Sequence, residues 1–105
     1  MPAVREFVDA RGRSPYKRWF DGLNARAAAT VATALTRLAL GNYSNVKSVS
    51  AGVFELRIFF GPGYRVYFGN DGEDVVILLG GGSKQRQSRD ISAAIANWQN
   101  YKSRK

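Results

Sequence analysis

Residues 56 to 68 read LRIFFGPGYRVYF, and this stretch decides the fold class. Two runs that alternate apolar and polar residues flank Gly61-Pro62-Gly63, a turn sequence, so the stretch predicts a β-hairpin. The alternation extends the first strand back to residue 53, and the second strand covers residues 64 to 68. A three-residue turn would pair Phe60 with Tyr64.

The same alternation places five side chains on one face of the hairpin, opposite the apolar side chains: Glu55, Arg57, Phe59, Arg65 and Tyr67. In this register Phe59 lies opposite Arg65, and Arg57 lies opposite Tyr67. Guanidinium groups bind phosphates through paired hydrogen bonds, and aromatic rings stack on unpaired bases, so this face fits a platform for single-stranded RNA. The alternative is a solvated face that keeps the sheet in solution.

The other elements follow from helical and strand periodicity. They are a strand at residues 3 to 8, a short helix from Ser14-Pro15, a long helix from Asn24 to Gly41, a strand at residues 75 to 79 and a closing helix from Ser88. VVILL at residues 75 to 79 is apolar throughout, which predicts a central strand. The order β-α-α-β-β-β-α predicts a single α+β domain over residues 1 to 105, with a mainly antiparallel sheet and helices on one face.

Composition narrows the function. The chain has 16 Lys and Arg against 8 Asp and Glu, a net charge of +8, so a polyanion or an acidic protein is the expected partner. It has no Cys and no His, which excludes disulfides, thiolate metal sites and a histidine base. We expect no metal or other cofactor. With no apolar run of membrane-spanning length, a cytoplasmic location without membrane contact is expected.

The segment GGGSKQRQSRD, residues 80 to 90, leaves the predicted central strand with three glycines, which allow close approach of another group. It then offers the cations Lys84, Arg86 and Arg89. A flexible turn is the simpler interpretation of the glycines, and the spacing of a phosphate-binding loop is missing. Trp19 and Trp98 fall on apolar helical stripes and are predicted to be core residues.

GVFELRIFFGPGYRVYF together with VVILLGGGSKQRQSRDI resembles the RelE/ParE superfamily of toxins from type II toxin-antitoxin systems. Within it the chain is most similar to the addiction module killer protein branch of HigB-like toxins. The resemblance implies a RelE-like fold and a ribosome-dependent endoribonuclease that cuts mRNA in the decoding site. It also implies inhibition by a cognate antitoxin, expected to carry a helix-turn-helix DNA-binding domain.

By the same resemblance, Arg65 matches the strand arginine of the family, Arg57 one of its strand lysines, and Lys84 the basic position after the last strand. Two positions depart from the family pattern: Glu55 stands where a second cation would sit, and Asp90 or Ile91 occupies the region of an expected tyrosine. The residues expected to bind RNA are Phe59, Tyr67, Arg86 and Arg89.

The sequence therefore predicts a metal-independent toxin that inhibits translation. In it, Arg57 and Arg65 stabilise the charge on the phosphate, and Lys84 protonates the leaving oxygen or neutralises its charge. Proton transfer falls to Lys84, Tyr67 or Glu55, or to ribosomal RNA. A ParE-like inhibitor of DNA gyrase and an inactive protein that only binds its antitoxin are the alternatives.

Overall fold

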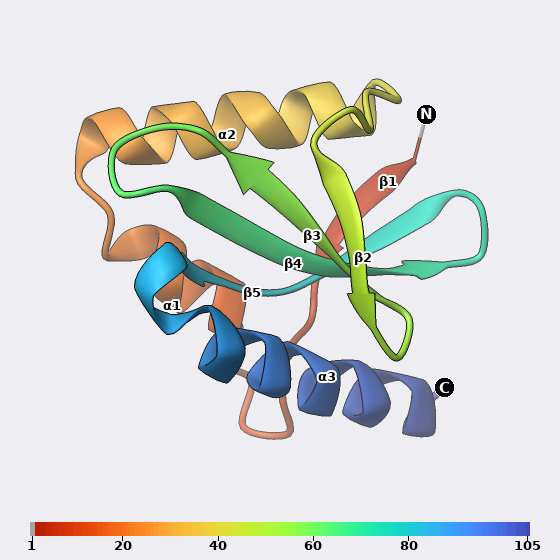
Figure 1. Cartoon of the computed structure of the whole chain (residues 1–105). Helices are drawn as coiled ribbons and strands as arrows, with labels where there is room; N and C mark the ends of the chain where they lie inside the picture. The colour runs from red at the N-terminus through yellow and green to blue at the C-terminus, as the bar shows by residue number, and fades with distance from the viewer. Residues whose placement is uncertain (1) are drawn as a thin grey trace.

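The computed structural model describes residues 2 to 105, in which a five-stranded sheet lies between helices (Figure 1). The strands are β1 (Ala3–Glu6), β2 (Val46–Ser50), β3 (Val53–Ile58), β4 (Tyr64–Asp71) and β5 (Val75–Ser83). The helices are α1 (Pro15–Asp21), α2 (Ala25–Ala39), the short 3₁₀ helix η1 (Lys84–Arg86) and α3 (Gln87–Ser103). No helix within residues 2 to 105 has both the length and the apolar character needed to cross a membrane.

The sheet has the order β1-β5-β4-β3-β2. Every pair is antiparallel except β1 with β5, so the prediction of a mixed α+β fold with a mainly antiparallel sheet is confirmed. The predicted central strand, β5, is an interior strand, but β4 occupies the centre. The sequence analysis also missed β2, because Val46 and Val49 are the only apolar residues in its five-residue stretch VKSVS.

Helices α1 and α2 pack on one face of the sheet and begin where the sequence predicts. The Ser14 side chain accepts a hydrogen bond from the first turn of α1, and the Asn24 side chain does the same for α2. Gly41, just past the end of α2, has φ of +94°. The core on this face consists of Tyr16, Val31, Leu38, Leu56, Ile58, Val66, Phe68, Val76 and Leu78.

Helix α3 packs on the opposite face, so the prediction of helices on one face with the other partly open is wrong (Figure 1). The physical reason is a second core on the face that carries the arginines. Its buried residues are Phe7, Val53, Tyr67, Ile77, Leu79, Ala94 and Trp98. Helix α3 begins at Gln87, directly after η1, so the predicted cap at Ser88 is also wrong.

Two glycines leave room for tryptophan side chains that pack on the two faces of the sheet. An added Cβ would lie 2.6 Å from the Trp98 ring at Gly69, and 2.2 Å from the Trp19 ring at Gly81. The two tryptophans are core residues, as predicted: Trp98 is buried and Trp19 packs against the first core. The glycines therefore serve packing within the protein.

Candidate functional site

Strands β3 and β4 bring Arg57 and Arg65 together as direct cross-strand partners. The expected register, with Arg57 opposite Tyr67, is therefore wrong by two residues. The connection runs from Phe59 to Gly63, so five residues separate the strands instead of three. Two guanidinium groups on facing positions repel each other unless an anion lies nearby, which makes this end of the sheet suited to anion binding.

Arg65 has such an anion inside the protein. Its Nε lies 3.4 Å from Oε2 of Glu55, and the two side chains are 12% and 2% exposed. The Gln87 amide, at the start of α3, donates to the same Glu55 oxygen at 3.0 Å. Arg65 thus lies under the edge of α3 and is not on an open face, contrary to the sequence analysis.

Arg57 makes a different contact from Arg65, because it makes no ion pair among the described residues and lies against an exposed ring. Its guanidinium lies over the Phe59 ring at 5.6 Å from the ring centroid, and Phe59 is 75% exposed. The Arg57 Nε is buried and has no hydrogen-bond partner among the described residues. Phe59, which the sequence analysis placed opposite Arg65, therefore contacts Arg57 instead.

Tyr67 cannot serve as the RNA-stacking residue that the sequence analysis expected, because it is fully buried beneath α3. Burial, with the Glu55 and Asp90 carboxylates nearby, raises the pKa of its phenol far above the usual range. Asp90 reaches from α3 toward Gly82, and burial raises its pKa as well. Tyr67 and Asp90 are thus part of the interface that holds α3 on the sheet.

Lys84, Arg86 and Arg89 are exposed at the junction of η1 and α3. The backbone N–H of Lys84 donates to the Gly63 carbonyl at 3.1 Å, which ties η1 to the β3–β4 turn. Because Arg65 pairs with Gly82, two residues before Lys84, the three predicted catalytic residues lie at the same end of the sheet. A surface hollow there is lined by Lys84, Gln85, Arg86, Gln87, Ser88 and Arg89.

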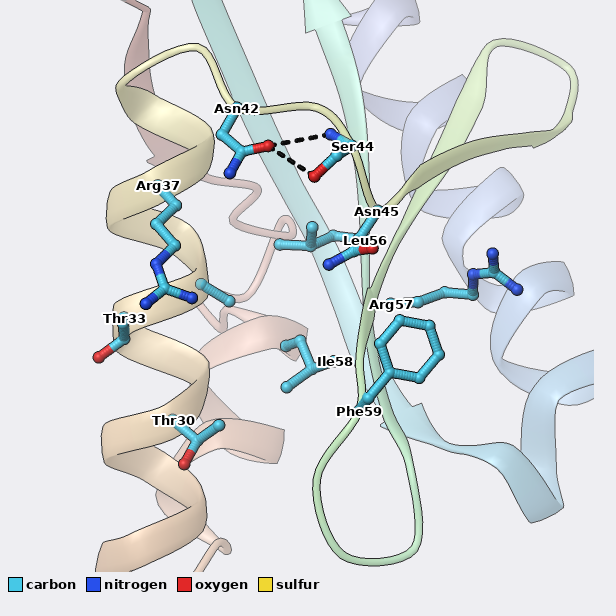
Figure 2. Close-up of a pocket in the computed structure, with 11 residues that line it drawn as sticks. Thr30, Thr33, Arg37, Asn42, Ser44, Asn45, Leu56, Arg57, Ile58 and Phe59 are labelled. Atoms are coloured by element: carbon cyan, nitrogen blue, oxygen red, sulfur yellow. Dashed lines mark hydrogen bonds between the residues drawn. The ribbon is translucent and has the colours of Figure 1, made fainter.

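A second feature at this end of the sheet is a groove of about 410 Å³ between α2 and the end of β3 (Figure 2). Its lining residues are Thr30, Thr33, Ala34, Arg37, Asn42, Ser44, Asn45, Leu56, Arg57, Ile58 and Phe59. The sequence analysis missed this groove. Its walls come from three separate segments, and no local pattern marks Arg37 or Asn45 as binding residues.

Comparison with known proteins identifies the family. Residues 18 to 98 match the family model described as Phage derived protein Gp49-like (DUF891). The chain belongs to the Gp49-like family. An uncharacterised protein of Haemophilus influenzae is similar to it, with 46% identity over 80 residues that cover 75% of this chain and 81% of the relative. Gp49-like proteins are commonly the toxins of toxin-antitoxin pairs, which implies an antitoxin partner.

Proposed function

We propose that this Gp49-like protein is a RelE-like toxin that cleaves mRNA on the ribosome and is neutralised by a cognate antitoxin. The observation that carries the proposal is the direct pairing of Arg57 with Arg65 at the end of the sheet where η1 brings Lys84. Two guanidinium groups and an ammonium group, all on a rigid scaffold, suit stabilisation of the charge on a phosphate undergoing substitution.

The proposed reaction is transfer of the phosphoryl group within the RNA. The substrate 2′-oxygen attacks the adjacent phosphorus as its proton leaves, and the bond from phosphorus to the 5′-oxygen breaks. Arg57 and Arg65 stabilise the added negative charge, and Lys84 donates a proton to the leaving 5′-oxygen.

Burial of the side chains favours one candidate for proton transfer. Glu55 is buried in its ion pair and Tyr67 is buried with a raised pKa, whereas Lys84 is exposed. Lys84 is therefore the favoured acid. In this scheme ribosomal RNA accepts the proton of the 2′-hydroxyl. Phe59, Arg86 and Arg89 contribute to RNA binding from the exposed surface around the three cations.

The proposed antitoxin carries a helix-turn-helix DNA-binding domain and an acidic segment. The net charge of +8 and the exposed cations at the start of α3 favour an acidic segment that covers this end of the sheet. Such a segment would prevent access of mRNA to Arg57 and Lys84.

Lys84→Ala tests the proposal, with Lys47→Ala as the matched control, because both lysines are exposed and make no ion pair among the described residues. We expect Lys84→Ala to fold normally and to lose activity on the order of 100-fold, by analogy with loss of a single charge-stabilising donor. Each variant is induced without antitoxin, and growth and pulse labelling are recorded.

Early loss of protein synthesis with wild type and Lys47→Ala, but not with Lys84→Ala, supports the proposal. Early loss of DNA synthesis would indicate a ParE-like inhibitor of DNA gyrase instead. Growth arrest by Lys84→Ala equal to that of wild type would refute the role of Lys84. Normal growth with induced, folded wild type would indicate a protein that only binds its antitoxin.

A further inference from the structure

We propose that the groove between α2 and the end of β3 binds a single unpaired nucleotide of RNA, adjacent to the cleavage site. This inference rests on the proposed function and adds a site that contributes base preference. In the proposed complex the base stacks on Phe59, Arg37 contacts a phosphate, and Thr33 and Asn45 form hydrogen bonds with the edge of the base.

The chemistry of the groove fits a nucleotide. Its lining contains the Arg37 side chain, five hydroxyl or amide side chains and an exposed phenylalanine, and it contains no acid; Figure 2 shows the Arg57 side chain directed away from α2. Arg37, Thr33 and Asn45 make no side-chain hydrogen bond or ion pair within residues 2 to 105, so all three are free to bind a ligand. Unpaired bases are recognised by this combination of aromatic stacking and hydrogen bonding at base edges.

The size and floor of the groove indicate one nucleotide. Its volume of about 410 Å³ falls within the range of about 300–1,000 Å³ typical of small-ligand sites, and it is too small for a duplex. Ala34, Leu56 and Ile58 form an apolar floor, against which the flat face of a base or a sugar can lie. Figure 2 shows Arg37 and Thr33 on the α2 side and Phe59 on the β3 side.

The groove is continuous with the candidate cleavage site through Arg57 and Phe59. Arg57 pairs with Arg65 on the sheet and borders the groove, while its side chain points away from α2 (Figure 2). Phe59 lies beside the Arg57 guanidinium and keeps most of its surface exposed. An RNA strand bound at Arg57 would therefore pass Phe59 and place the neighbouring nucleotide in the groove.

The edge of the sheet at this point is open but short. The last backbone bond between β3 and the β2 segment is from Arg57 N–H to the Asn45 carbonyl at 3.0 Å. The backbone of Phe59, two residues further, makes no such bond among the described residues. A peptide that added a strand would need a longer run of free backbone groups, which favours a nucleotide over an extended peptide.

The test uses four fluorescein-labelled homohexanucleotides with 2′-O-methyl groups, one for each base, which lack the attacking hydroxyl and cannot be cut. Fluorescence anisotropy gives the affinity of the wild type and of Arg37→Ala, Phe59→Ala and Asn45→Ala. Arg26→Ala is the matched control, because Arg26 is exposed on the same helix but does not line the groove.

We expect Phe59→Ala to weaken binding about tenfold, as loss of one stacked base would. Arg37→Ala should weaken binding and reduce the slope of log affinity against log salt by about 0.7, as loss of one phosphate contact in single strands does. Asn45→Ala should reduce the difference in affinity among the four homopolymers. Arg26→Ala should change affinity less than twofold.

Three results would overturn the inference. The first is no binding of any of the four oligonucleotides to the wild type at millimolar concentration, and the second is equal RNA affinity of Arg37→Ala and Arg26→Ala. The third is an acidic hexapeptide that binds the wild type but not Arg37→Ala, while RNA binds both proteins equally. The proposed function is judged separately by pulse labelling with Lys84→Ala. If the induced wild type stops protein synthesis but the groove variants bind the oligonucleotides as the wild type does, the nucleotide site is rejected and the proposed function is not.

Discussion

Replacement of Arg65 by alanine should lower the free energy of unfolding, because it leaves the Glu55 carboxylate buried without its cation. Glu55 is 1% exposed, and its Oε2 is contacted by Arg65 at 3.4 Å and by Gln87 at 3.0 Å. After the substitution the neutral amide of Gln87 would still donate to this carboxylate. The amide supplies a hydrogen bond but no compensating charge.

The magnitude follows from the burial of the pair. Removal of one partner of a buried ion pair costs about 3–5 kcal/mol, and we take the lower value, about 3 kcal/mol, because Arg65 retains some exposure. For a domain of this size, a loss of 1 kcal/mol lowers Tm by about 4–8 °C, so Arg65→Ala should lower Tm by about 12–24 °C. An arginine on an open face would have cost only about 0.5 kcal/mol.

The assay is urea unfolding followed by tryptophan fluorescence, with Arg57→Ala as the matched control. Arg57 has the same side chain on the neighbouring strand but makes no ion pair among the described residues, so its loss should cost less than about 1 kcal/mol. The double variant Glu55→Leu/Arg65→Met should recover most of the stability, because apolar residues of similar size can replace a buried pair.

Equal stability of Arg65→Ala and Arg57→Ala would refute this reasoning, as would a double variant less stable than Arg65→Ala alone. The result also governs how toxicity is interpreted. If Arg65→Ala is unstable, its loss of toxicity reports folding, and Arg65→Lys becomes the informative variant. Lysine keeps the charge opposite Glu55 but cannot form paired hydrogen bonds with a phosphate, so partial toxicity is expected.

Three further predictions concern packing, pH and the partner. Gly81→Ala should cost about 1–3 kcal/mol because its Cβ would lie 2.2 Å from the Trp19 ring, whereas Gly80→Ala, with nothing within 4 Å, should be tolerated; equal melting temperatures would contradict this. Hydrogen bonds from Lys105 and Tyr101 lower the pKa of Asp71, so this carboxylate should stabilise the fold above pH 3.8 and lose that effect as the pH falls through its pKa in the folded protein. Asp71→Asn should therefore lower Tm at pH 7 but not near pH 2, and an equal decrease in Tm at both pH values would contradict the prediction. Antitoxin affinity should fall as salt rises from 0.05 to about 0.5 M, and an affinity independent of salt would indicate a mainly apolar contact.

The elements with strong local signals were predictable from the sequence. Ser14 and Asn24 begin α1 and α2 as expected, and the alternating residues of β3 and β4 form a hairpin. Local capping and period-2 patterns depend on neighbouring residues only. Strand β2 escaped prediction because its serines and lysine carry little strand preference, and its pairing with β3 provides what the local sequence lacks.

The location of α3 required information that no local pattern contains. Its apolar stripe predicts a helix with one buried face, but it does not specify which face of the sheet receives it. Gly69 permits the observed packing, because it leaves space on the sheet for the Trp98 ring. The error had a direct consequence for the site: the face that was predicted to be open is covered at Tyr67 and Arg65, and it is exposed at Phe59.

The surroundings of position 55 explain why an acid, and not a second cation, stands there. A second cation there would stand beside Arg65 beneath α3, where neither charge would have a partner and burial would be unfavourable. Glu55 instead binds Arg65 and receives a hydrogen bond from Gln87, so one carboxylate fixes the direction of the arginine and the start of α3. The start of α3 is also where η1 ends and Lys84 is presented, next to the turn that joins β3 and β4. An acid in place of a cation thus lowers the positive charge of the site by two units. In return, its contacts with Arg65 and Gln87 hold the neighbouring cations in a fixed position.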